Sequence, residues 1–91
     1  AVFANNFVNA SFIGANEVIK GNESLKFDYL LPIIQQTVDK ISVGNPIDSQ
    51  TGPAKRNDVS TISEHLKMLS NSISEQELYA AISKYIQQKF D

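Results

Sequence analysis

Residues 50–58 read Gln50-Thr51-Gly52-Pro53-Ala54-Lys55-Arg56-Asn57-Asp58, a polar segment between two strongly helical halves of the chain. Adjacent Gly and Pro interrupt any regular element, so we expect this segment to form a loop between helices. Loops that are held by a rigid scaffold often carry binding groups. The segment is therefore the first candidate for a functional site.

Hydrophobic periodicity predicts two helices before this loop and two after it. They are expected over residues 2–20, 27–41, 59–71 and 74–89. No strand-like alternation of useful length is present, and no internal repeat. The predicted fold is therefore all-α. We expect one domain, residues 1–91, that resembles a four-helix bundle with a long polar loop between its second and third helices.

The expected helix ends rest on capping residues. Asn57 or Asp58 is the predicted cap of the third helix, and Ser74 with Glu77 forms a predicted capping box for the fourth. The spacing of apolar residues also predicts which side of each helix is buried. For the first helix the face is Phe3, Phe7, Ala10, Gly14 and Val18, and Val8, Phe12, Ala15 and Ile19 extend it into an arc of roughly 200°. For the fourth helix it is Leu78, Ala81, Ile82, Tyr85 and Ile86.

Composition and charge exclude several kinds of protein. The chain has no Cys, which excludes disulfides, thiolate catalysis and cysteine metal sites. A formal charge of -2 with interspersed signs argues against nucleic acid and anionic membranes as partners. The apolar first nineteen residues contain four Asn and Glu17, which are costly in hydrocarbon. We expect a cytoplasmic protein without a membrane span or a metal site.

The chain opens inside an apolar helical pattern, with no capping residue before Val2 and Phe3. A helix usually begins with Ser, Thr, Asp or Asn just ahead of its periodic residues. We therefore expect this domain to be part of a longer protein.

Asparagine side chains form a polar stripe on the first predicted helix. At 100° per residue, Asn5, Asn9 and Asn16 lie almost in line, with Asn6 to one side. Amides offer donors and an acceptor in a fixed plane and suit a ligand. The alternative is that they cap neighbouring helices or line a subunit contact.

The polar loop and the single histidine are the other candidates. Arg56 and the backbone N–H groups at the start of the third helix could bind an anion. The alternative is a well-formed turn in which Asp58 caps the helix and Arg56 is solvated. His65 belongs to no recognised catalytic motif, and we expect it to be structural or to face solvent.

Two motifs carry a resemblance: Ala-Val-Phe-Ala-Asn-Asn-Phe-Val-Asn at residues 1–9, and Gln50 to Asp58 followed by His65-Leu66. Together they resemble the C-terminal helical domain, long described as a domain of unknown function, of a family of NADP-dependent oxidoreductases. The architecture is similar to the 6-phosphogluconate dehydrogenase C-terminal-like group, which includes ketopantoate reductase and the coenzyme-F420-linked NADP reductases.

The resemblance implies a substrate-side and dimerisation domain that is not catalytic alone. It implies an N-terminal Rossmann domain that binds NADP, a homodimer and a small-molecule substrate, with no cofactor bound by these residues themselves. The substrate-binding residues that it implies are Asn6, Asn9, Gln50, Thr51, Gly52, Arg56 and Asp58. The proton donor is not identified, because Ala1 stands where ketopantoate reductase-type enzymes carry a Lys one turn before the Asn.

Two other functions are compatible with the same residues. One is a non-catalytic helical interaction module whose apolar first helix is a dimerisation surface. The other is a regulatory domain that binds a metabolite without turnover. The first alternative predicts no effect of Asn6 or Arg56 substitutions on activity, and the second predicts metabolite binding without cofactor oxidation.

Overall fold

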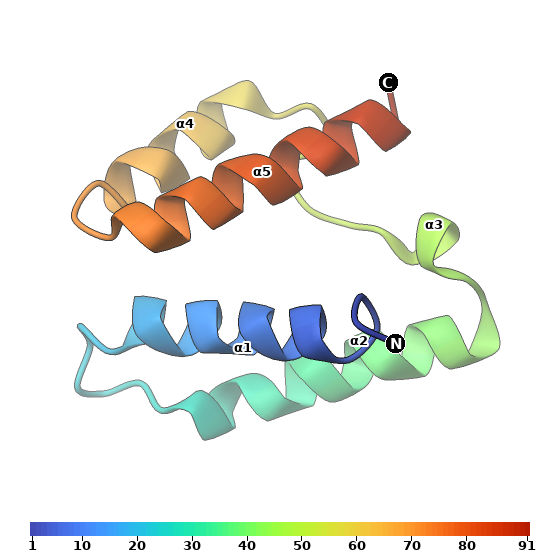
Figure 1. Cartoon of the computed structure of the whole chain (residues 1–91), viewed down its shortest axis with the longest axis horizontal. Coiled ribbons are helices and arrows are strands. Elements are labelled where there is room, and N and C mark those ends of the chain that lie inside the picture. The colour runs from blue at the N-terminus through green and yellow to red at the C-terminus, as the bar shows by residue number, and fades with distance from the viewer. The chain divides into compact units, whose positions relative to one another are not determined.

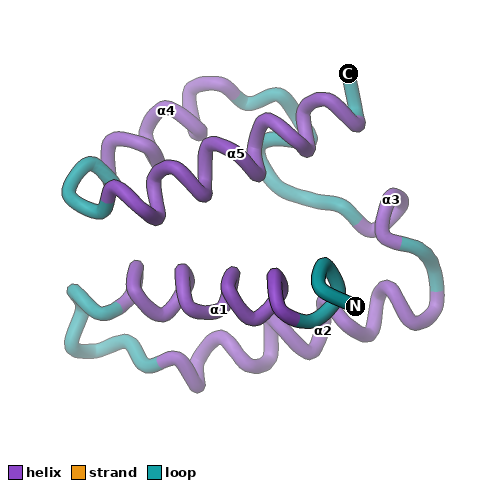
Figure 2. Tube along the Cα trace, viewed as in Figure 1, coloured by secondary structure: helices purple, strands orange, loops and turns teal.

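The computed structural model describes all of residues 1–91 and consists of helices and turns (Figure 1, Figure 2). The elements are α1 (Asn6–Ile19), the 3₁₀ helix η1 (Phe27–Leu30), α2 (Leu31–Val43), α3 (Pro46–Ser49), α4 (Val59–Met68) and α5 (Ile73–Lys89). There is no strand, so the predicted all-α class is confirmed, and each of the four predicted helices is present. The chain divides into two units, Ala1–Val38 and Asp39–Asp91, whose boundary falls inside α2.

In the first unit, α1 begins at Asn6, four residues later than predicted. The residues before it form a separate turn in which the Phe7 N–H donates to the carbonyl of Val2 at 2.9 Å. Asn5 occupies the capping position but its side chain makes no capping hydrogen bond. The Asn5 N–H donates to the Ala1 carbonyl at 2.9 Å, but the i to i−5 bond of Phe7 interrupts this pattern, and the Asn9 N–H resumes it by donating to the Asn5 carbonyl.

The contact of α1 within its own unit is with η1. The rings of Phe12 and Phe27 meet edge to face, with centroids 6.3 Å apart. Phe12, Ala15 and Ile19 follow helical spacing and are partly buried. This side belongs to the predicted apolar arc, and it is the partly buried side of α1.

Of the other residues in the predicted arc only Gly14 is partly buried, so the prediction is wrong for Phe3, Phe7, Val8, Ala10 and Val18. No residue of α1 is buried, and Val18 is 53% exposed. Phe3 and Phe7 stack on each other in a T-shaped pair with centroids 4.9 Å apart, yet they are 82% and 51% exposed. The apolar arc of α1 is wide enough to present one side to η1 and leave the other exposed.

The helix predicted over residues 27–41 is divided into η1 and α2. Pro32, which lacks an N–H, takes the second position of α2, where no intrahelical donor is needed. α2 ends at Val43, directly before Gly44, close to its predicted end.

The short helix α3 lies within the predicted loop and was not expected. Asn45 caps it, accepting from the Asp48 N–H at 2.9 Å and donating its amide to Asp48 Oδ2 at 2.8 Å. Pro46 follows at the first helical position, which suits its fixed φ. The Asn-Pro pair was the sequence signal for this helix.

The second unit contains the antiparallel pair α4 and α5, joined by a short turn (Figure 1). The Gln76 side chain donates to the Leu66 carbonyl at 2.7 Å and ties the start of α5 to the end of α4. α5 begins at Ile73 with Ser72 at the capping position and no side-chain cap. The predicted capping box at Ser74 is therefore wrong, because Ser74 already lies inside the first turn.

The buried face predicted for α5 is also mostly wrong. Leu78, Ile82 and Tyr85 are 38%, 42% and 60% exposed. The partly buried row is instead Gln76, Tyr79, Ser83, Ile86 and Phe90. Of the predicted set only Ile86 lies in it. None of the helices combines the length and the apolar character that crossing a membrane requires.

Candidate functional site

The loop of residues 50–58 has a defined backbone. Gly52 has φ of +101° and Asn57 has φ of +54°, a conformation that Gly and Asn tolerate best. Backbone hydrogen bonds join the Asp58 N–H to the Pro53 carbonyl at 2.9 Å and the Asn57 N–H to the Ala54 carbonyl at 3.2 Å. The loop is therefore a folded turn, and its backbone fixes the positions of the Cα atoms that carry its side chains.

The same loop is anchored to α5. Ala54, within the loop, is the single buried hydrophobic residue of the chain, at 5% exposure. The ammonium group of Lys55 lies over the Phe90 ring, 5.1 Å from its centroid. The Gln87 amide donates to Asn57 Oδ1 at 3.4 Å. These contacts hold the loop against the last turns of α5.

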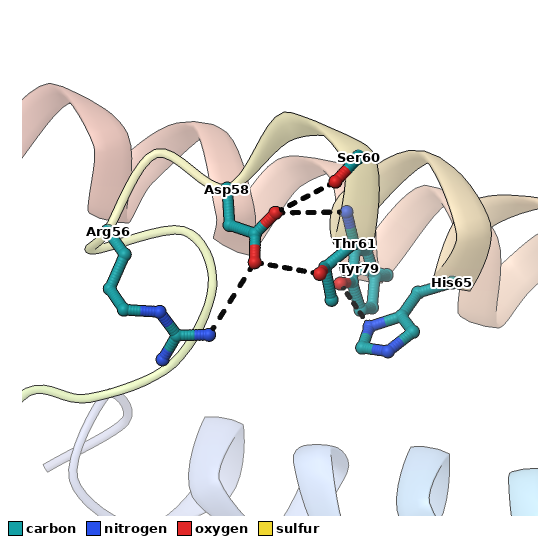
Figure 3. Close-up of polar contacts among 6 residues, drawn as sticks. All are labelled: Arg56, Asp58, Ser60, Thr61, His65 and Tyr79. Atoms are coloured by element: carbon teal, nitrogen blue, oxygen red, sulfur yellow. Dashed lines mark hydrogen bonds and ion pairs between the residues drawn. The ribbon is translucent and has the colours of Figure 1, made fainter.

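Asp58 caps α4 as predicted. Its Oδ1 accepts from the Thr61 N–H at 3.2 Å and from the Ser60 hydroxyl at 3.1 Å, and its Oδ2 accepts from the Thr61 hydroxyl at 2.7 Å (Figure 3). The hydrogen bond from the Thr61 hydroxyl, followed by that from its N–H, lowers the pKa of the Asp58 carboxyl. The carboxylate therefore remains charged at neutral pH.

The Arg56 guanidinium group contacts this carboxylate through one of its nitrogen atoms. Its Nη2 lies 3.8 Å from Asp58 Oδ2, and 63% of the Arg56 side chain is exposed (Figure 3). A guanidinium group has five N–H donors, so most of them stay available to a ligand. The arrangement suits an anion such as a carboxylate.

The predicted site residues fall into two groups. Gln50, Thr51, Gly52, Arg56 and Asp58 lie together in the folded loop, with the Gln50 amide donating to the Thr51 carbonyl at 2.9 Å. Asn6 and Asn9 are exposed on α1, in the other unit. Their convergence with the loop on one ligand stays a prediction.

A groove of about 450 Å³ lies between α3 and the end of α5. It is lined by Asn45, Pro46, Ile47, Gln50, Tyr85, Ile86, Lys89 and Phe90. The Lys89 ammonium group lies 5.1 Å from the centroid of the Tyr85 ring. Gln50 is the single predicted site residue that lines this groove. The sequence pattern did not predict the groove because it did not predict α3.

His65 and Tyr79 form a second polar pair that the sequence did not reveal. His65 Nδ1 and the Tyr79 hydroxyl are 2.7 Å apart, linking α4 to α5 (Figure 3). Burial raises the pKa of the Tyr79 hydroxyl, which therefore stays protonated. The two residues are 14 positions apart, so no local motif could have shown the contact.

Comparison with known proteins identifies relatives of this chain. A family described as "Domain of unknown function (DUF2520)" matches residues 1–86. The crystal structure of a "putative NADP oxidoreductase" from Bacteroides fragilis matches with a TM-score of 0.89 and 39% identity, over 96% of this chain and 33% of that chain. A comparison with curated proteins gave no match.

These findings confirm the coarse part of the resemblance. The chain spans about a third of the length of the oxidoreductase that it matches. Its folded loop lies inside the part of the chain that the family covers. The chain belongs to the DUF2520 family.

Proposed function

We propose that this chain is the substrate-side helical domain of an NADP-dependent oxidoreductase whose nucleotide is held by a separate N-terminal Rossmann domain. The observation that carries the proposal is the match, at 39% identity, to a third of a larger chain described as a putative NADP oxidoreductase. A relation to the 6-phosphogluconate dehydrogenase C-terminal-like group, including ketopantoate reductase, is part of the proposal. So is a homodimer.

The loop supplies the group that would bind the substrate. Arg56 presents an exposed guanidinium group on a backbone that is fixed by Gly52 and by the Asp58 cap. Such a cation pairs best with a carboxylate, since two parallel N–H donors match its two oxygens. We therefore propose a small oxo acid as the substrate, with Gln50, Thr51, Asn6 and Asn9 as further contacts.

The first test is cofactor binding, measured by titration calorimetry with NADPH. The full-length protein should bind NADPH tightly, and residues 1–91 alone should not. Tight binding by residues 1–91 would contradict the division of roles, and no binding by the full-length protein would contradict the proposed function.

The second test is the Arg56→Ala variant of the full-length protein, followed through NADPH oxidation with a panel of small oxo acids. Loss of a charged hydrogen-bonding partner should raise KM for these acids by roughly 10- to 100-fold. KM for an uncharged carbonyl compound should change little. Lys84→Ala is the control, because Lys84 is an exposed cation on α5, outside the loop.

A dimerisation module without catalysis remains the second candidate. The exposed ring pair Phe3 and Phe7 favours it, because exposed apolar patches often mark protein contacts. Under this function Arg56→Ala leaves any activity of the full-length protein unchanged, whereas Phe3→Ser together with Phe7→Ser changes the mass measured by light scattering.

A further inference from the structure

The contact between His65 and Tyr79 fixes the orientation of the imidazole ring. Nδ1 lies 2.7 Å from the Tyr79 hydroxyl, and the two rings meet edge to face with centroids 5.6 Å apart. Both residues are partly buried, His65 on α4 and Tyr79 on α5. The ring is therefore held from one nitrogen, while Nε2 makes no hydrogen bond to another group of the chain.

A tyrosine hydroxyl can hold Nδ1 in either protonation state of the imidazole. It accepts from Nδ1–H in the charged ring and also in the neutral ring that has lost its Nε2 proton. Nε2 thus remains the nitrogen that can give up or take a proton. Because burial raises the pKa of the Tyr79 hydroxyl, Tyr79 keeps its own proton while it does so.

His65 lies on the same side of α4 as the guanidinium group of Arg56. Asp58, Thr61 and His65 are spaced by three and four positions, which places them on one face of the helix. Figure 3 shows the Arg56 and His65 side chains directed to that same side of α4. A cation, a hydroxyl and an imidazole therefore follow one another along a single face.

Local contacts and helical spacing connect Arg56 to His65 along this face. Arg56 Nη2 is 3.8 Å from Asp58 Oδ2, which is 2.7 Å from the Thr61 hydroxyl. Thr61 and His65 are then neighbours four positions apart, with Cβ atoms about 5–6 Å from each other in a helix. A carboxylate and a carbonyl oxygen are the two groups of an oxo acid that the Arg56 guanidinium group and the His65 imidazole can each bind.

We propose that His65, oriented by Tyr79, donates the proton to the carbonyl oxygen of an oxo acid whose carboxylate pairs with Arg56. This assignment rests on the proposed function and names the proton donor that it leaves open. A reduced nicotinamide on the Rossmann domain would supply the hydride to the carbonyl carbon; as the C=O π bond breaks, the oxygen takes the Nε2 proton of the imidazolium. A hydroxy acid and NADP⁺ result, and neutral His65 regains a proton from solvent.

Tyr79 is a positioning residue in this scheme, since its hydroxyl contacts the imidazole and not the substrate. Asp58 has its own role on this face. Its carboxylate accepts three hydrogen bonds and keeps Arg56 close to the face without occupying all of its donors.

The test uses the full-length protein, with NADPH oxidation by small oxo acids as the readout. His65→Ala should lower kcat by about 100-fold or more, the range for loss of a general acid, while the Kd for NADPH stays unchanged. Added imidazole should restore part of kcat in this variant. Tyr79→Phe keeps the ring and should lower kcat with little change in KM. Lys67→Ala, an exposed change on α4, is the control.

His65→Gln guards against a variant that fails to fold, since the longer amide fills similar space but cannot serve as an acid. It should lose kcat as His65→Ala does, without rescue by imidazole. Wild-type kcat in His65→Gln, or a loss in His65→Ala that imidazole does not relieve, would overturn the assignment while the proposed function stands. A wild-type protein that neither binds NADPH nor reduces oxo acids would overturn both.

Discussion

Gly52 has the backbone conformation in the loop that residues with a side chain adopt least readily. Its φ of +101° is strained for any residue with a Cβ, although no atom lies within 4 Å of the Cβ position. Gly52→Ala should therefore destabilise the protein by about 1–2 kcal/mol through backbone strain alone. Thermal or urea unfolding of the variant measures this.

Gly21→Ala is the matched control for this substitution. A Cβ at Gly21 also meets nothing within 4 Å, and its φ lies outside the strained region. Its stability should stay within a few tenths of a kcal/mol of wild type or rise slightly. Equal effects of the two substitutions would show that φ at Gly52 is not what matters.

Asp58 makes the stability of the folded protein depend on pH, and the direction of this effect follows from the shift of its pKa. Its carboxyl pKa is lowered below the ordinary 3.8 by the Thr61 hydroxyl and N–H, so the folded protein binds the proton less readily than the unfolded chain does. The contribution of this cap is present above the ordinary pKa and is lost as pH falls through the lowered value.

The pH effect is measured by comparing Asp58→Asn with wild type in urea titrations between neutral and acid pH. Asn caps a helix nearly as well as Asp and carries no charge. The stability difference between the two proteins should therefore shrink as pH falls. A difference that stays constant down to the lowest pH would contradict the role given to the charged cap.

Sequence reasoning succeeded at residues whose chemistry is local. Gly52 and Pro53 predicted the turn, and Asp58 was one of two named caps. It did not foresee the left-handed Asn57, since many residues after a turn are extended instead. It also missed the partner of His65, because contacts between helices depend on packing that no single motif encodes.

At the scale of elements, the contact between α4 and α5 depends on Gln76. Its amide donates to the Leu66 carbonyl at 2.7 Å, at the end of α4, where this carbonyl also accepts from the Leu69 N–H at 3.2 Å. Gln76→Ala should cost about 1 kcal/mol in unfolding free energy, since the hydrogen bond between α5 and α4 is lost and the Leu66 carbonyl keeps only the Leu69 N–H. Chemical denaturation gives the value.

Gln88→Ala is the control for this prediction. Gln88 is exposed in the same helix, and the higher helix propensity of Ala should leave stability unchanged or slightly raised. If both variants were equally stable, the bond between Gln76 and Leu66 would contribute nothing to the pairing of the two helices.

Helix positions were predicted better than helix faces. The 3.6-residue period located the four longer helices, but it selected Leu78, Ile82 and Tyr85 as the inner face of α5. α5 has apolar residues on more than one side, and α4 contacts the side that carries Tyr79. Periodicity reports that a face is apolar and does not report which neighbour covers it.

At the scale of the whole molecule, large apolar side chains remain exposed. No large side chain is fully buried, and the Phe3 and Phe7 rings lie side by side at 82% and 51% exposure. Residues 1–91 prepared alone should therefore bind a hydrophobic fluorescent dye. Replacing both Phe side chains by Ser should weaken dye binding, because the contiguous apolar patch that they form is removed.

Val43→Ser together with Met68→Ser is the control pair. These side chains are 89% and 81% exposed but lie on different helices. The control should lose less dye fluorescence than the Phe pair at the same helicity by circular dichroism. Equal losses would mean that the two rings do not form a distinct patch.

The anchoring of residues 50–58 has a consequence for limited digestion with trypsin. Lys55 and Arg56 are adjacent cleavage points in a connecting segment, where proteases usually cut first. A protease needs a stretch of chain that can be pulled into extended form, and burial of Ala54 and the ring contact of Lys55 oppose this. Trypsin should cleave the peptide bonds after Lys20 and Lys26 first. The segment around Arg56 should remain uncleaved within a larger fragment.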